Sequence, residues 1–153
     1  MIVFRLAKSI YQNDLSGSGA EMYGGRWNSK GTPMIYTSQS RALCVAEIAV
    51  HSPLGVLPKD YCLITIGIPE SCTIKQIHES NLPMNWVSIP HIHETQKLGD
   101  VFIKNAKTLV LKVPSAVVQG DWNFLINPLH QDISLVKIIS VEEYSFDKRL
   151  FLK

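Results

Sequence analysis

Three side chains between residues 26 and 47 are the chain's clearest candidates for chemistry. Arg26 stands in a glycine-rich turn, Tyr36 in a short apolar run, and Glu47 in a segment that is otherwise apolar. Burying any of these groups near a protein core costs free energy unless the group has a hydrogen-bond or ion-pair partner. A group without such a partner is therefore a candidate for a functional role. An arginine, an aromatic hydroxyl and a carboxylate together suit an anionic ligand whose reaction develops positive charge.

The elements that must position these groups follow from the pattern of apolar residues. We expect a helix at residues 41–51, capped by Ser38 or Ser40, and a second at 95–106 with Gly99 as its weak point. The first helix is apolar nearly all round, which predicts burial, so Glu47 must face a pocket or pair with a cation. Residues 14–25 predict a glycine-rich loop and residues 81–93 a segment that wraps the surface. Strands are expected at residues 2–6, 34–37, 61–68, 73–77, 108–113, 123–127 and 135–139. This succession of elements indicates an α+β fold.

The segment at residues 24–47 closely resembles the RES domain, the toxin half of bacterial toxin–antitoxin pairs, which is named for an Arg, a Glu and a Ser. Those three residues would be Arg26, Glu47 and Ser115 here. Further matching segments follow in the family's order at residues 96–100, 113–117 and 123–130. The chain departs from the family pattern at Phe102, where a Trp is common, and at Gln131, where a Pro is common.

The resemblance implies the fold of the ADP-ribosyltransferases, with two small, mostly antiparallel sheets that clamp NAD between them and helices on their flanks. Glu47 would stabilise the ribosyl cation that forms when nicotinamide leaves, as carboxylates do in glycoside hydrolysis. Arg26 would hold phosphate or ribose through its planar fork of donors, and Tyr36 would stack on nicotinamide and anchor the ribose. The substrate site would be completed by Ser115, Asn123, Ser38 and Trp27. NAD would be a substrate, with no separate cofactor and no metal.

The resemblance leaves the acceptor open among water, phosphate and a protein side chain. The protein is therefore expected to deplete NAD by hydrolysis or phosphorolysis. The alternatives are a protein mono-ADP-ribosyltransferase and a toxin that binds or cuts RNA. The expected partner is a helix-turn-helix antitoxin that binds DNA and covers the active-site cleft, and a toxin homodimer is a further expectation.

Simpler structural roles exist for the same residues. Arg26 could pair with a nearby acid, and Glu47 could form a buried ion pair with Arg5 or Arg26. Tyr36 could pack in its strand, Trp27 in the core or a pocket wall, and Ser115 could satisfy a turn. Asn123 and Asn127 are in phase on one strand, although capping also explains Asn127. His91 and His93 are the minimal start of a metal site, which is a weak indication without a third ligand.

Bulk properties narrow the class of protein. A chain of 153 residues with 46% apolar residues fits one domain at residues 1–153. Its net charge of +2 comes from scattered basic residues, so nucleic acid is not an expected partner. The three cysteines show no paired spacing, which favours a reducing cytoplasm. We expect neither a signal peptide nor a membrane span, because no apolar run is long enough.

Overall fold

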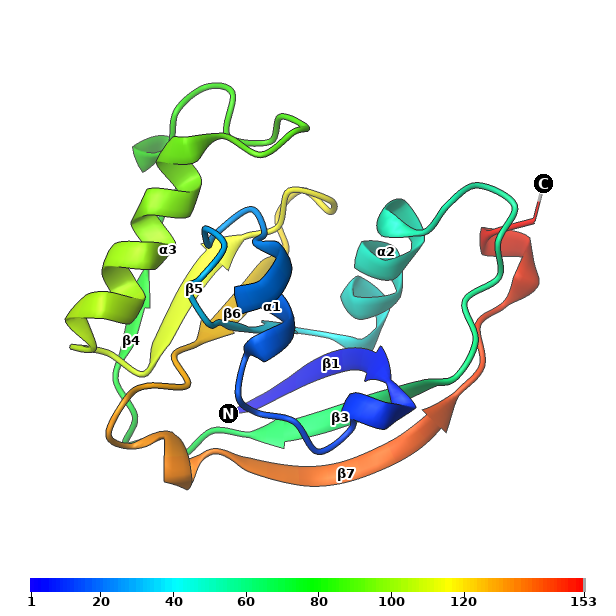
Figure 1. Cartoon of the computed structure of the whole chain (residues 1–153), viewed down its shortest axis with the longest axis horizontal. Coiled ribbons are helices and arrows are strands. Elements are labelled where there is room, and N and C mark those ends of the chain that lie inside the picture. Colours follow the sequence, from blue (N-terminus) through cyan, green and yellow to red (C-terminus); the bar gives the residue numbers. More distant parts are fainter. Residues whose placement is uncertain (153) are drawn as a thin grey trace.

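The computed structural model describes residues 1–152, in which three α-helices flank a seven-stranded sheet (Figure 1). The strands are β1 (Ile2–Lys8), β2 (Ile35–Ser38), β3 (Tyr61–Gly67), β4 (Ile74–Gln76), β5 (Val110–Pro114), β6 (Trp122–Ile126) and β7 (Lys137–Tyr144). The α-helices are α1 (Ser18–Tyr23), α2 (Arg41–His51) and α3 (His93–Asn105), and short 3-10 turns lie at Ser9–Tyr11, Glu79–Asn81, Ile133–Leu135 and Lys148–Leu150. The α+β prediction is confirmed, and every expected strand and helix is present.

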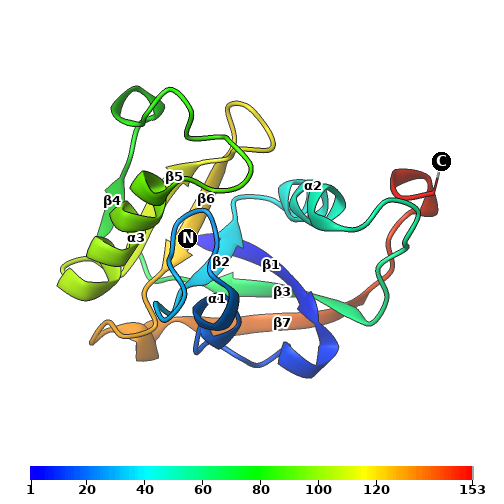
Figure 2. The ribbon, with the colours of Figure 1, turned by 45° about the horizontal axis from the view of Figure 1, so that its top comes forward.

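The sheet consists of two parts joined at one place. Its order is β4-β5-β6-β2-β1-β3-β7, and every pairing is antiparallel except the parallel pairing of β4 with β5. At the junction, β1 and β2 are paired only at Phe4 and Ser38, whereas β1 pairs with β3 along its whole length. Figures 1 and 2 show the two parts spreading apart from this junction. The expectation of two separate sheets therefore needs one correction, since this pair makes them one sheet.

The molecule has two apolar cores. The first core joins β1 and β3 to residues of β2, β5 and β6, and includes Val3, Ile64 and Ile126. The second lies between α3 and the β5–β6 part of the sheet, and includes Phe102 and Leu125. Helix α3 buries Thr95, Gly99, Phe102 and Ile103, which share one helical face.

Gly99 is a point of close contact, not the weak point expected. A Cβ atom at this position would stand 1.6 Å from the carbonyl oxygen of Trp27. Only glycine lets the helix backbone approach the turn at residues 24–28 so closely.

Two other expectations were wrong in part. The segment expected as a loop at residues 14–25 contains α1, which begins after Gly17, a residue with a left-handed φ of 73°. Helix α2 is not buried all round. Its main contacts are with β1 and β2, and Leu43 and Cys44 are buried while Val50 is 59% exposed. Its cap is Ser40, whose Oγ accepts a hydrogen bond from the backbone N–H of Leu43.

Within the described residues, no helix has both the length and the apolar character needed to cross a membrane.

Candidate active site

Two adjoining cavities meet where the two parts of the sheet join. The smaller, of about 230 Å³, lies between β1, β2 and α2, and its wall includes apolar side chains such as Phe4, Leu6 and Ile48. The larger, of about 290 Å³, is bounded by the turn that carries Arg26 and by His91. Both cavities are lined by Tyr36, Glu47, His51 and Asn123. The shared residues include two of the three groups that the sequence singled out first.

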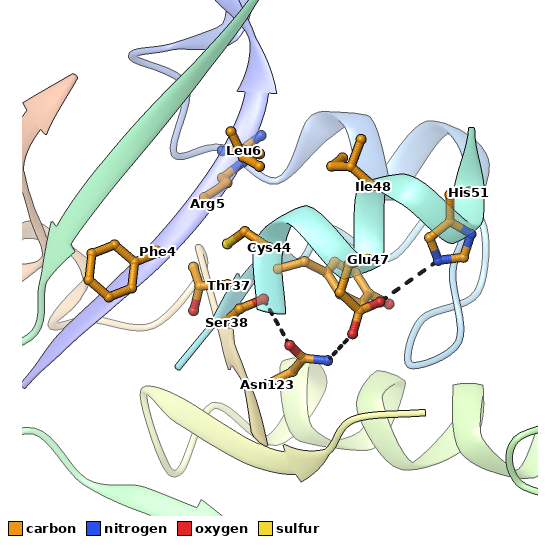
Figure 3. Close-up of a pocket in the computed structure, with 11 residues that line it drawn as sticks. Phe4, Arg5, Leu6, Thr37, Ser38, Cys44, Glu47, Ile48, His51 and Asn123 are labelled. Atoms are coloured by element: carbon orange, nitrogen blue, oxygen red, sulfur yellow. Dashed lines mark hydrogen bonds and ion pairs between the residues drawn. The ribbon is translucent and has the colours of Figure 1, made fainter. Parts of the chain in front are cut away.

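Glu47 is held by hydrogen bonds from two other elements. Its Oε1 accepts one from Asn123 Nδ2 at 2.8 Å, and its Oε2 lies 3.9 Å from His51 Nε2 (Figure 3). Oε1 accepts a second hydrogen bond from Ser115 Oγ at 3.1 Å. The side chain of Glu47 is 24% exposed. The alternative of a buried ion pair with Arg5 or Arg26 is not seen, since His51 is the basic residue within 4 Å of this carboxylate. Glu47 therefore presents a charge, oriented by neutral donors, to both cavities.

The donors to Glu47 are themselves oriented. Ser38 lies opposite Asn123 in the sheet, and its Oγ donates to Asn123 Oδ1 at 3.0 Å, which turns the amide nitrogen toward Glu47 (Figure 3). Ser115 Oγ accepts hydrogen bonds from the backbone N–H groups of Val117 and Val118. Its single proton is thereby left for Glu47. Ser115 both satisfies its turn and positions the carboxylate, so the two roles considered for it are not exclusive.

Arg26 also lines the larger cavity. Its guanidinium donates hydrogen bonds to the backbone carbonyl oxygens of Trp86, Val87 and Ser88. Burial lowers the pKa of Arg26, and the nearby Glu47 and Tyr36 oppose this shift. Arg26 therefore has carbonyl partners in the surface segment at residues 81–93, not the acidic partner that its simpler interpretation required.

Tyr36 contributes its ring to both cavities and uses its hydroxyl within the protein. The hydroxyl donates to Asn28 Oδ1 at 2.7 Å and accepts from the backbone N–H of Trp27 at 3.1 Å. Burial raises the pKa of Tyr36 far above its ordinary value. Because the hydroxyl already donates its one hydrogen bond to Asn28, it can only accept a hydrogen bond from a ribose hydroxyl.

The turn that carries Arg26 is fastened to α3. Gln96 Nε2 donates to the carbonyl oxygen of Gly25 at 3.0 Å, and Asp100 Oδ1 accepts from the backbone N–H of Ser29 at 2.9 Å. Trp27 is 2% exposed and lies 6.1 Å from Trp86 between ring centroids, so it is a buried wall of the cavity. Residues 96–100, which lie about 70 residues later in the chain, thus position the turn that carries Arg26.

Sequence reasoning missed several residues at this site. Arg5 was considered only as an ion-pair partner, yet it lines the smaller cavity and donates to the carbonyl oxygen of Asp14. His51 was missed although it follows Glu47 by one helical turn, a spacing that places both on one face. His91 lines the larger cavity, and its buried Nδ1 has no hydrogen-bond partner. Asn127, in contrast, is fully buried away from the site, where it caps a loop.

In the part of the chain that the structure describes, no third ligand completes the minimal metal motif of His91 and His93. Among residues 1–152, no group of three or more histidine, cysteine or acidic side chains is placed to bind a metal ion. His91 faces the larger cavity, whereas His93 is exposed as the first residue of α3.

Comparison with known proteins places the chain in a family. Residues 2–147 match the model of the RES domain. The chain is 34% identical over 149 residues to the "Prs ADP-ribosylating toxin" of Sphingobium sp. (strain YBL2), a match that covers 96% of this chain and 92% of the relative. It is 35% identical over 155 residues to "Toxin Res" of Pseudomonas putida (strain KT2440), covering 99% and 100% of the two chains.

A solved structure confirms the fold. A chain from the crystal structure of the M. tuberculosis MbcT–MbcA toxin–antitoxin complex superposes with a TM-score of 0.74 and 18% identity, over 98% of this chain and 86% of that one. At this identity the likeness concerns the arrangement of elements alone.

Proposed function

The chain belongs to the RES domain family, and we propose that it is the toxin of a bacterial toxin–antitoxin pair that depletes NAD by cleaving the nicotinamide–ribose bond. The relatives named as toxins support the first half of this proposal. The observation that carries the second half is Glu47, a carboxylate oriented at the junction of the two cavities.

The two cavities suit the two sides of the bond to be cleaved. The smaller is lined by Tyr36 and by apolar side chains such as Phe4 and Ile48, beside Arg5 and other polar groups. The aromatic and apolar part of this wall fits a flat, uncharged leaving group such as nicotinamide. The larger has Arg26 on its wall, which fits the ribose and pyrophosphate of the rest of the molecule. Glu47 lines both and would meet the positive charge that develops on the ribose carbon between them. Nicotinamide leaves as a neutral base, so one carboxylate suffices.

The positioning residues have separate tasks in this proposal. Asn123 and Ser115 hold Glu47 Oε1, and Ser38 acts through Asn123. Trp27 forms a wall of the larger cavity. Arg26 would bind phosphate while keeping or exchanging its carbonyl partners at residues 86–88.

A second candidate is a mono-ADP-ribosyltransferase that uses the same residues and passes the ADP-ribosyl group to a protein. The name of the Sphingobium relative, an ADP-ribosylating toxin, favours it. Incubation with labelled NAD and cell extract separates the two activities, because transfer leaves label on protein and hydrolysis leaves it on free ADP-ribose.

We further propose that the protein acts in the cytoplasm and is silenced by an antitoxin. The structural neighbour was solved together with its antitoxin, which supports a protein partner; its helix-turn-helix type and a toxin homodimer are parts of the proposal that rest on the family. Cys44, Cys62 and Cys72 are all free thiols, as expected in a reducing compartment.

Induced expression in bacteria tests the main proposal. Intracellular NAD should fall before translation or membrane potential does, and Glu47→Gln should abolish the fall. Growth arrest with unchanged NAD would instead favour protein modification or damage to RNA.

A further inference from the structure

His51 is the titratable group beside Glu47 to which the proposed function assigns no task. It is the last residue of α2, its Nε2 lies 3.9 Å from Glu47 Oε2, and it lines both cavities (Figure 3). Its side chain is 58% exposed, so the ring is open to the solvent from which an attacking water comes. Histidine is the side chain that most often transfers protons as a general acid or base.

The other titratable groups at the site are unsuited to accept a proton from water. Burial raises the pKa of Tyr36, and raises that of Cys44 to about 11, so both stay protonated; the Tyr36 hydroxyl also donates a hydrogen bond to Asn28. An arginine stays charged, which removes Arg5 and Arg26. His91 lines only the larger cavity and has its Nδ1 buried without a partner.

Glu47 itself is poorly placed for proton transfer. Its Oε1 is occupied by Asn123 and Ser115, and its charge is needed opposite the ribosyl cation. The oxygen that remains, Oε2, faces His51.

We propose that His51 is the general base that activates water for attack on the ribose carbon, which makes the acceptor water. This inference rests on the proposed cleavage of NAD. The bond between the ribose carbon and the nicotinamide nitrogen breaks, and its electron pair leaves with nicotinamide. The water oxygen then bonds to the ribose carbon and its proton passes to the unprotonated nitrogen of His51. The products are nicotinamide, ADP-ribose and one proton, which His51 returns to solvent.

The same carboxylate serves both stages. When water attacks, the positive charge on the ribose is lost and a positive charge forms on the imidazole of His51. Glu47 would stabilise the first charge and lies 3.9 Å from the ring that carries the second. A phosphate dianion would need no base, because it attacks without losing a proton. The role of His51 therefore distinguishes hydrolysis from phosphorolysis.

Several titratable or charged groups share the cavities with His51. Glu47 lies one turn earlier on α2, Arg26 and His91 line the larger cavity, and Arg5 of β1 lines the smaller one. A general base accepts a proton only in its unprotonated form, so the rate of hydrolysis should fall at acid pH.

The experiment uses the purified full chain with NAD in phosphate-free buffer, and measures kcat and KM from about pH 5 to pH 8, the range in which imidazoles ordinarily titrate. His51→Gln removes the base but keeps a donor near Glu47. The control is His93→Gln, which changes an exposed histidine that does not line either cavity. Melting temperatures of all three proteins show whether the fold is kept, which we expect because His51 is exposed.

We expect His51→Gln to lower kcat by about a hundredfold to ten-thousandfold, with KM unchanged, and to remove the acid limb that the wild type and His93→Gln show. Partial recovery of His51→Ala by added imidazole would support the same role. A His51→Gln variant that keeps the wild-type kcat and acid limb would overturn the inference while leaving NAD cleavage intact. A rate that rises in wild type and variant alike when phosphate is added, with ribose phosphorylated in the product, would overturn water as the acceptor. A wild-type protein without NAD turnover would refute the proposed function and this inference with it.

Discussion

Glu47 and Arg26 both line the larger cavity, and they are held in different ways. Glu47 stands on a helix and is held by side chains from a strand and from the turn after β5. Arg26 stands in a turn and is held by backbone carbonyl oxygens of a second surface segment. One side of the site is therefore built on regular elements and the other on loops.

This difference matches the tasks proposed for the two groups. A charge that must stabilise a transition state gains most from a fixed position. Of the partners of Glu47, Asn123 is fixed in β6 and Ser115 is held by backbone N–H groups of the turn after β5. A group that binds a large substrate must be able to exchange its hydrogen-bond partners within the protein for the substrate. Carbonyl oxygens of a surface loop, such as those that Arg26 contacts, allow this exchange. The comparison predicts that changes at Glu47 alter the rate, while changes at Arg26 alter affinity.

The largest effect is expected from Glu47→Gln. The amide keeps the shape of the side chain but loses the charge opposite the ribosyl cation, so kcat should fall by about a hundredfold to a thousandfold with little change in KM. Because no arginine pairs with Glu47, the melting temperature should change little. Turnover and thermal melting of the same purified variant measure both.

Glu143→Gln is the matched control, since Glu143 is an exposed acid on β7, away from both cavities. An unstable Glu47→Gln protein with normal turnover per folded molecule would reverse the assignment and make Glu47 a structural residue.

Arg26→Lys should act on affinity. Lysine keeps the charge but has no planar fork, and losing one charge-assisted hydrogen bond costs about 1.5–3 kcal/mol, which corresponds to a KM for NAD raised by about tenfold to a hundredfold. Arg41→Lys, on an exposed arginine paired with Glu142, is the control. A wild-type KM in Arg26→Lys would show that Arg26 only holds the segment at residues 86–88.

Gly99→Ala tests the contact between α3 and the turn that carries Arg26. The added methyl would collide with the backbone of Trp27, so the free energy of unfolding should fall by about 1–3 kcal/mol, with a raised KM as the turn shifts. Gly19→Ala is the control, because a Cβ at this helical position meets nothing within 4 Å. Chemical denaturation compares the two, and equal stability would mean that α3 and the turn are not in tight contact in solution.

The smallest effect concerns His91. Burial, Arg26 and His51 lower the pKa of His91, so the unfolded chain binds a proton more readily than the folded one. Its contribution to stability is thus present above about pH 6.5, the ordinary imidazole value, and is lost as pH falls below it. His91→Gln should lose less melting temperature than the wild type between neutral and mildly acidic pH. An identical loss in both proteins would contradict this placement of His91.

The local sequence pattern predicted the helices and strands well, because the spacing of apolar residues and the capping residues that indicate an element lie within that element's own segment. The spacing of apolar residues and the serine cap were enough for α2, whose predicted bounds match the observed helix. The helix α1 was missed because it is short and is flanked by two glycines, Gly17 and Gly24. Gly17 lies so close to the backbone of Met34 that a Cβ there would collide with it, a contact that the local pattern does not show. The burial of α2 was overestimated, since a local pattern does not show that only one of its sides meets the sheet.

The sequence by itself determined which residue types could do chemistry at this site: Arg26, Tyr36 and Glu47 were evident from type and spacing, and Ser115 and Asn123 from the family pattern. Only the tertiary structure decided what these groups face. Ser115 and Asn123 reach Glu47 across 68 and 76 residues, and Arg26 meets carbonyl oxygens 60 to 62 residues away. A hydrogen bond requires its two atoms to lie within about 3 Å of each other. Strand pairing brings such atoms together, and their spacing along the chain does not predict which ones will meet.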